Sequence, residues 1–135
     1  MGSLLSKMKL KSGSRAAIIN APEGYWEEIR PMPAGVRVED KLQGEFDWIQ
    51  VFVKTKADLG KLIPRVLPSL KPESILWISF PKGSSKEQTD LTRDKGWEAV
   101  KTAELKWINL ISINESWSAF SMRPFRPGEE KKSFR

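Results

Sequence analysis

The chain has 135 residues, enough for one domain with a buried core, and its composition is 39% hydrophobic and 30% charged, as in ordinary globular proteins. It contains neither cysteine nor histidine, which excludes disulfides, thiolate or imidazole metal ligands and the His-dependent nucleophilic triads. The net charge of +6 is concentrated at the two ends of the chain, so we expect no dedicated nucleic-acid surface on the folded part.

The two ends differ from the middle in composition. Residues 1–14 are rich in lysine and serine and show no sustained apolar period, which predicts a flexible N-terminal segment with one helical turn around 4–10. Residues 124–135 combine proline, glycine and a run of charge, which predicts a disordered tail. We therefore expect a single α/β domain over residues 15–123. No apolar run approaches the roughly 20 residues of a membrane-spanning helix.

Short apolar runs rich in branched and aromatic side chains predict strands. They lie at residues 15–20, 36–38, 46–53 and 75–80. The runs at 46–53 and 75–80 are apolar throughout, as in strands that are buried on both faces of a parallel sheet. Trp48 and Trp77 lie in these runs, Trp117 in a later strand-like run and Trp97 on an apolar helix stripe, so we expect these four to pack in the core.

Helical patterns separate these strands. A helix is predicted after Pro22, and a longer one over residues 56–70, where Thr55 and Asp58 stand in the positions of a capping box. A third helix is predicted to begin at Thr89 or Asp90.

The end of the domain changes character. Strand-like segments at 105–113 and 117–122 are joined by Asn114-Glu115-Ser116, a connection typical of an antiparallel hairpin. Strands that alternate with helices imply a parallel sheet with right-handed crossovers. The predicted fold class is therefore a three-layer, Rossmann-like α/β domain with a mostly parallel sheet and a C-terminal antiparallel hairpin.

Two segments carry a resemblance to a known family. Phe46-Asp47 before an apolar run, and L-K-P-E-S-I-L-W-I-S at residues 70–79, resemble the fourth strand and the turn into the fifth strand of class I S-adenosylmethionine-dependent methyltransferases. The closing hairpin is similar to the last two strands of that family. The resemblance implies a reduced methyltransferase-like fold, with S-adenosylmethionine as the alternative cofactor to none at all.

The same resemblance implies cofactor-binding positions. Gly24 would belong to the turn after the first strand, and Glu39 or Asp40 would hold the ribose hydroxyls. The chain departs from the family pattern here, because Pro22 stands where the family has a glycine-rich turn. A strand and a helix between the second and fourth strands are also missing.

A second resemblance spans nearly the whole chain. It is carried by N-A-P-E-G-Y at residues 20–25, F-D at 46–47, S-F-P-K-G-S-S-K at 79–86, T-D-L-T-R-D at 89–94 and W-S-A at 117–119. Together these segments resemble a small bacterial family of uncharacterised proteins, known as a domain of unknown function. That resemblance implies a bacterial, cytoplasmic protein and brings no activity with it.

Ligands of parallel α/β sheets bind beyond the carboxyl ends of the strands, which points to the turn after residue 20 and the polar loop after residue 80. The candidate ligand-binding residues there are Asn20, Glu23, Tyr25, Lys82, Ser84, Ser85, Lys86, Thr89 and Arg93. Hydroxyl, ammonium and guanidinium groups beside a helix N-terminus suit an anion such as phosphate or carboxylate. The competing interpretation is an ordinary solvated loop with capping residues.

Three hypotheses follow. The first is a non-catalytic domain that binds a small anionic molecule or a protein partner at the loop after residues 75–80, with no metal and no complete catalytic set. The second is a divergent S-adenosylmethionine-dependent methyltransferase. The third is an interaction module that uses the hairpin at 105–122 as an exposed edge. The oligomeric state is left open.

Overall fold

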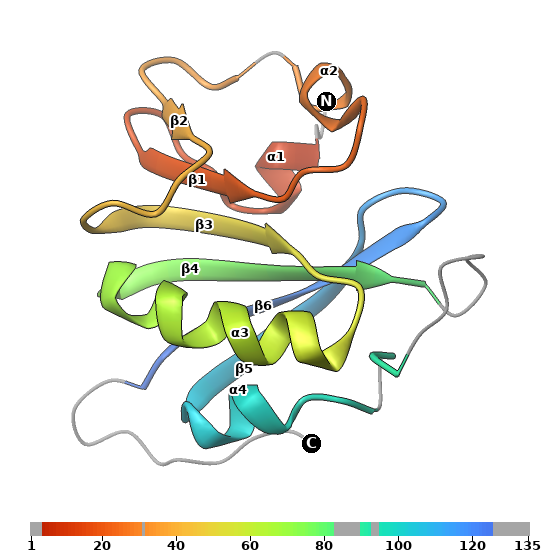
Figure 1. The fold of residues 1–135 in the computed structure, drawn as a ribbon. Coiled ribbons are helices and arrows are strands. Elements are labelled where there is room, and N and C mark those ends of the chain that lie inside the picture. The colour runs from red at the N-terminus through yellow and green to blue at the C-terminus, as the bar shows by residue number, and fades with distance from the viewer. Residues whose placement is uncertain (1–3, 31, 83–89, 93–94, 126–135) are drawn as a thin grey trace.

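The computed structural model describes residues 4–30, 32–82, 90–92 and 95–125. The strands are β1 (Arg15–Ile19), β2 (Arg37–Glu39), β3 (Phe46–Phe52), β4 (Leu70–Pro81), β5 (Leu105–Ser112) and β6 (Trp117–Pro124). The helices are α1 (Leu4–Lys7), α2 (Tyr25–Glu28), α3 (Lys56–Val66) and α4 (Glu98–Thr102), and a 3₁₀ turn, η1 (Leu67–Ser69), extends α3. Figure 1 shows these elements around one sheet.

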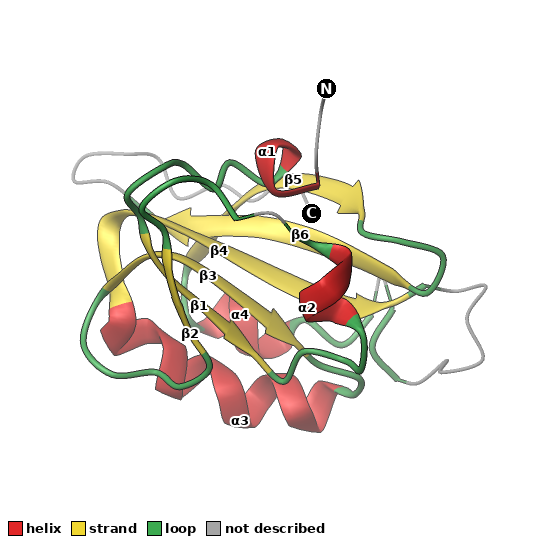
Figure 2. Cartoon of the chain, turned by 90° about the horizontal axis from the view of Figure 1, so that it is seen from above, coloured by secondary structure: helices red, strands yellow, loops and turns green. Residues whose placement is uncertain are grey.

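The described residues form a single six-stranded sheet in the order β2-β1-β3-β4-β6-β5. Strands β2, β1, β3 and β4 are parallel, and β6 runs antiparallel to both β4 and β5. Helices α1 and α2 lie on one face of the sheet, and α3 and α4 lie on the other (Figure 2). The fold class predicted from the sequence is therefore confirmed, and a closing antiparallel hairpin extends the parallel part of the sheet.

The chain leaves β1 and β3 in opposite directions. From β1 it crosses through α2 to β2, and from β3 it crosses through α3 to β4 on the other face (Figure 2). Because these crossovers diverge, β1 and β3 flank the point where the winding of the sheet reverses. Crevices at such points are the usual ligand sites of open α/β sheets.

Alternate residues of the central strands supply two separate cores. On β3, Ile49 and Val51 belong to the core under α3 and α4, and Trp48 and Phe52 belong to the core under α1 and α2. This division follows from the period of two along a strand. The four tryptophans expected in the core are buried, and so is Trp107; the buried ones are Trp48, Trp77, Trp97, Trp107 and Trp117.

The N-terminal segment differs from the expectation of a flexible stretch over residues 1–14. Leu5, Met8 and Leu10 are each at most 5% exposed and belong to the core under α1. The indole Nε1 atoms of Trp48 and Trp77 both donate to the carbonyl oxygen of Met8, each at 2.8 Å. Three apolar side chains, and a carbonyl oxygen that accepts two hydrogen bonds, hold α1 against the sheet.

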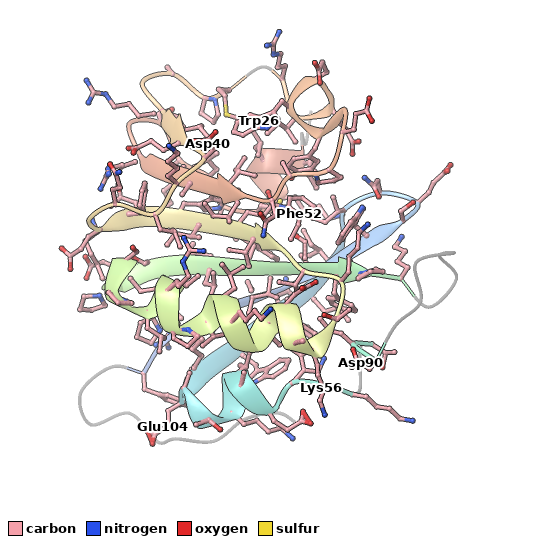
Figure 3. The ribbon with its side chains drawn as sticks, in the orientation of Figure 1. Trp26, Asp40, Phe52, Lys56, Asp90 and Glu104 are labelled. Carbon is pink, nitrogen blue, oxygen red and sulfur yellow. The ribbon has the colours of Figure 1, made fainter. Side chains whose placement is uncertain are left out.

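The start of α3 carries two carboxylate caps. Thr55 and Asp58 form the predicted capping box, with Thr55 Oγ1 accepting from the Asp58 N–H at 3.0 Å. Asp90, expected to begin its own helix, instead accepts a 2.9 Å hydrogen bond from the Lys56 N–H, and the two residues lie side by side in Figure 3. The first N–H groups of a helix lack partners within the helix, so Asp90 supplies an acceptor for the first N–H of α3. The next helix, α4, begins only at Glu98.

At the amino-terminal edge of the sheet, Arg15 connects three segments. Its Nε donates to Glu39 Oε2 at 3.0 Å, its guanidinium lies 4.0 Å from the centre of the Phe46 ring, and its backbone N–H donates to Asp47 Oδ2 at 2.8 Å. Asp47 also pairs with Lys71. The Arg15 N–H and the Lys71 ammonium lower the pKa of the Asp47 carboxyl below its ordinary value. Asp47 thus joins the starts of β1 and β4.

Candidate functional site

The turn after β1 and the loop after β4 leave the sheet at the same edge. Ile19 is in register with Val51, and Val51 is in register with Ile78. Since β1, β3 and β4 are parallel, Asn20, which follows β1, and Pro81, the last residue of β4, both lie at the carboxyl edge of these strands, with the end of β3 between them. This arrangement agrees with the common rim expected from the sequence.

A cleft of about 600 Å³ opens at this edge. Four parts of the chain form it: the loop after β1, the end of β3, one side of α3 and the tip of the β5–β6 hairpin. The lining residues are Asn20, Pro22, Glu23, Phe52, Lys54, Asp58, Lys61, Leu62, Arg65, Ser116 and Trp117. The cleft therefore lies at the winding reversal between β1 and β3, where Figure 3 shows Phe52 at the end of its strand.

The loop between β1 and α2 has a distinctive backbone. Asn20 (φ 61°) and Gly24 (φ 83°) both adopt the left-handed conformation. A Cβ built on Gly24 would meet no other atom within 4 Å, so the position favours glycine for its backbone conformation and not for lack of space. Two left-handed residues turn the loop sharply, so that Pro22 and Glu23 line the cleft.

One side of the cleft is cationic. Lys61 and Arg65 lie four residues apart on α3 and are both exposed, and Lys54 follows β3. Within the described part of the chain, neither Lys61 nor Arg65 has a hydrogen-bond or ion-pair partner. Asp58, on the same side, carries one negative charge against these three cations, and its Oδ2 accepts the backbone N–H of Lys54 at 3.1 Å.

The floor of the cleft is apolar. Phe52, Leu62 and Trp117 are 3%, 5% and 8% exposed. The Phe52 ring meets Trp117 edge to face at 5.0 Å between centroids. A cationic wall above aromatic and aliphatic side chains suits a ligand that carries both a negative group and an apolar part.

Tyr25 lies beneath this floor and not in the cleft. It is 1% exposed, and its ring meets Phe52 at 4.8 Å between centroids. Its hydroxyl donates to Gln50 Oε1 at 2.7 Å, and Gln50 Nε2 donates to Ser79 Oγ at 3.0 Å. Burial raises the pKa of the Tyr25 hydroxyl well above its ordinary value. Tyr25 is thus a neutral, buried hydrogen-bond donor that supports the floor.

Apart from the buried Tyr25, the sequence-predicted ligand residues separate into three groups. Asn20 and Glu23 line the cleft. Lys82 turns instead to the hairpin, where its Nζ donates to Ser112 Oγ at 2.6 Å. The remaining ones lie outside the described residues: Ser84, Ser85, Lys86, Thr89 and Arg93.

The positions implied for a ribose-binding acid are not brought together with the cleft. Glu39 pairs with Arg15, and its Cα is in register with Ala17, three residues before Asn20. That offset places Glu39 about 10 Å short of Asn20 along the strand direction, at roughly 3.3 Å per residue. Asp40 follows β2 as an exposed residue. Of the implied cofactor positions, Gly24 alone belongs to the loop that borders the cleft.

The contributions of α3 and the hairpin to the cleft were not predicted from the sequence. Lys61 and Arg65 are spaced i, i+4, which places them on one side of a helix, and that spacing was the available signal. Trp117 was assigned to the core, and it also forms part of the floor.

In the described ranges, no group of three acidic residues is placed to hold a metal ion. None of the helices there has the length and apolar character needed to span a bilayer.

Comparison with solved structures identifies the fold. The chain is 11% identical to the ribosomal protein L11 methylase from Lactobacillus delbrueckii subsp. bulgaricus, with a TM-score of 0.59, covering 90% of this chain and 75% of that one. It is 10% identical to an O-methyltransferase family 2 protein from Planctomyces limnophilus, solved with apigenin, with a TM-score of 0.58, covering 84% of this chain and 50% of that one.

A third similar structure is the TehB-like SAM-dependent methyltransferase from Corynebacterium glutamicum. The identity is 12% and the TM-score 0.54, with 90% of this chain and 85% of that chain covered. No family model and no curated protein matches the sequence. At these identities the likeness concerns the fold, and the chain has a methyltransferase-like Rossmann fold.

Proposed function

We propose that the protein is a non-catalytic domain that binds a small anionic molecule in the cleft beyond β1 and β3. The observation that carries this proposal is the cationic wall of Lys54, Lys61 and Arg65 above the apolar floor of Phe52 and Trp117. The volume of about 600 Å³ lies within the usual range for small-molecule sites, roughly 300–1,000 Å³. On the strength of the family resemblance, the proposal places the protein in the bacterial cytoplasm.

The two sides of the cleft suggest how such a ligand is oriented. A carboxylate or phosphate is expected to meet Arg65, whose guanidinium can donate two parallel hydrogen bonds, with Lys61 beside it. An aromatic or aliphatic part of the ligand would cover Phe52 and Trp117. Glu23 on the opposite side would repel a second negative group and would accept hydrogen bonds from hydroxyl or amino groups.

The helix N-terminus next to the cleft is already occupied by the protein itself. At the start of α3, Thr55 Oγ1 accepts from the Asp58 N–H and Asp90 Oδ1 accepts from the Lys56 N–H. The anion is therefore expected to bind side-chain cations and not the helix dipole. The proposed role of the loop after β4 in the same site stays a prediction, because residues 83–89 lie outside the described part.

Fluorescence titration tests the proposal, since Trp117 lies in the floor. The probes are nucleoside monophosphates, sugar phosphates and aromatic carboxylates, each at fixed ionic strength. Lys61→Met and Arg65→Met keep an unbranched apolar side chain at each position and remove the charge. We expect each to weaken binding of the best probe about tenfold, the loss of one charge-assisted hydrogen bond.

Lys101→Met is the matched control, because Lys101 is exposed on α4 on the same face of the sheet but does not line the cleft. The affinity of the Lys101→Met variant for the probe should equal that of the unmodified protein. Equal weakening by Lys101→Met and Arg65→Met would mean that the probe responds to net charge alone. Binding of no probe, or chemical-shift changes confined to the opposite edge of the sheet, would also end the proposal.

The second candidate function is a divergent S-adenosylmethionine-dependent methyltransferase. The methyltransferase-like fold supports it, together with a left-handed Gly24 in the loop after β1. It predicts that S-adenosylmethionine and S-adenosylhomocysteine stabilise the protein against heat and move the amide signals of Asn20 and Gly24. Cofactor binding that survives Lys61→Met and Arg65→Met would favour this function over the first. Calorimetry without heat at high cofactor concentration would remove it.

A further inference from the structure

A second hollow lies away from the cleft, near the amino-terminal half of β4. It has a volume of about 310 Å³ and is formed by α1 with its following turn, β4, β6 and β5. Its floor includes Ile75 and Trp77 from β4 and Ser121 from β6, and Ile108 of β5 borders it. Figure 2 shows α1 over the sheet beside β5. We call this hollow, together with the outer edge of β5, the β5 surface.

The β5 surface is strongly basic. Lys7, Lys9 and Lys11, all exposed, stand along one side, and Arg123 stands at the end of β6. Glu73 is the one acidic residue among its lining residues. These four cations and one anion predict attraction for a negatively charged partner.

The edge of the sheet beside this basic wall is open in the described part of the chain. β5 is the last strand and pairs only with β6. Ile108 and Leu110 are 50% and 37% exposed, the two large hydrophobic side chains that are exposed there. The β5–β6 register shifts between Trp107 and Asn109, so Ile108 lies at an irregularity of the edge. At unpaired strand edges with apolar side chains, an extended segment can pair as an additional strand.

We propose that the β5 surface binds an acidic, extended peptide segment of a partner protein, which pairs with the outer edge of β5. Backbone hydrogen bonds to β5 would hold the segment in register. An apolar side chain of the segment would enter the hollow above Ile75 and Trp77, and its carboxylates would face Lys9 and Lys11. A peptide fits better than a nucleic acid, because Trp77 is only 1% exposed and presents no ring on which a base can stack.

The test uses the full chain and a fluorescent peptide of about eight residues, a usual strand length, that alternates glutamate with valine. The control peptides replace glutamate by lysine, or replace every second residue by proline, which cannot donate to a strand. We expect binding of the first peptide alone, weakened by salt. Hydrogen exchange of the amides at 106–110 should slow when the peptide is bound.

Two variants and a matched control locate the site. Lys9→Glu/Lys11→Glu should weaken the acidic peptide more than tenfold, and Ile108→Glu should do the same. Lys41→Glu/Lys101→Glu makes the same change of net charge on other exposed lysines and should leave the affinity within about twofold, since distant surface charges are screened. Circular dichroism of each variant verifies that it is folded.

Several results would overturn the inference. One is equal affinity of the two double variants for the acidic peptide. Another is binding of the lysine peptide or the proline peptide as tightly as the acidic one. Dimerisation in sedimentation that is abolished by Ile108→Glu, without peptide binding, would assign the edge to a second copy of the chain. Binding to anionic vesicles or to single-stranded RNA but not to the peptide would assign the basic wall to those polyanions.

Discussion

The hydrogen-bond chain beneath the cleft makes a quantitative prediction. In Tyr25→Phe the ring remains in place, but Gln50 Oε1 loses the donor that lies 2.7 Å away. Gln50 is 0% exposed, so no solvent replaces the lost hydroxyl. Leaving a buried acceptor unsatisfied costs about 1–3 kcal/mol. At about 4 °C for each kcal/mol in a protein of this size, the midpoint of thermal unfolding should fall by roughly 4–12 °C.

A companion variant separates this cost from a change in packing. Tyr25→Phe/Gln50→Met/Ser79→Ala removes all three polar groups of the chain and fills the space of Gln50 with a flexible apolar side chain. Because no buried polar atom is then left alone, the triple variant should recover most of the loss. Urea unfolding with an unchanged slope against denaturant verifies that the comparison concerns stability alone.

The same experiment decides what Tyr25 does. A loss below about 0.5 kcal/mol in Tyr25→Phe, the size of an ordinary surface substitution, would refute the role given to the buried hydrogen bond. A loss of ligand affinity with no loss of stability would restore the prediction from sequence that Tyr25 contacts the ligand. The structure favours the opposite outcome, in which stability falls and affinity is little changed.

Tyr25 is the single tyrosine of the chain, so its ionisation is directly observable. Its pKa is raised in the folded protein, so the folded state retains the proton above pH about 10, where an unfolded chain releases it. Its contribution to stability is therefore complete below that pH and falls as the pH rises towards the folded pKa. Tyrosinate absorbance that appears before the loss of circular dichroism would contradict a buried hydroxyl.

Three other predictions concern the framework. Deletion of residues 1–10 should lower the free energy of unfolding by several kcal/mol, or about half of a typical total stability, because it removes the buried side chain of Met8 and two indole hydrogen bonds. A truncated protein that unfolds cooperatively at the original temperature would contradict this. In Asp47→Asn the loss of stability at acid pH should become less steep. The folded pKa of the Asp47 carboxyl is lowered, so its stabilisation is present above pH about 4 and is lost as the pH falls through the folded pKa. Urea midpoints of both proteins from pH 7 downward measure this difference, and two curves that stay parallel would refute it. Thr55→Ala should lower the free energy of unfolding by about 1 kcal/mol, the loss of a helix N-cap, and equal urea midpoints for both proteins would exclude that role.

Local patterns were sufficient for the architecture. The runs before Phe52 and Pro81 are apolar on both faces, and the structure buries both faces of β3 and β4. The hairpin around Asn114 was also predicted. In the structure, Asn114 Oδ1 accepts from the backbone N–H groups of Ser116 and Trp117, as a turn-forming side chain does. Periodicity and turn chemistry are local properties, and these elements depend on little else.

Partners that are distant in the sequence explain the differences. The segment before residue 10 shows no sustained apolar period, and its buried residues gain their environment from Trp48 and Trp77. Asp90 was expected to cap its own helix and instead caps Lys56, 34 residues earlier. Glu39 was a candidate for the site, and Arg15, 24 residues before it, draws it towards the other edge of the sheet. A sequence pattern shows which groups can pair and not which of them meet.

The sequence predicted the position of the candidate site more accurately than the residues that form it. The edge of the sheet followed from strand order, and Asn20 and Glu23 line the cleft there. The cations came from α3, because its side chains reach back over the end of β3. Lys61 and Arg65 had no distinguishing feature beyond their spacing, since exposed helices commonly carry lysine and arginine.

The carbonyl of Met8 has a consequence for the order of folding. It accepts hydrogen bonds from indoles 40 and 69 residues away in the chain. Neither indole is in position until β3 and β4 have paired, so α1 can dock only after the parallel strands have assembled, although it is synthesised first. Contacts of such long range are formed slowly. We therefore expect substitutions at Met8 to accelerate unfolding while leaving the rate of refolding almost unchanged.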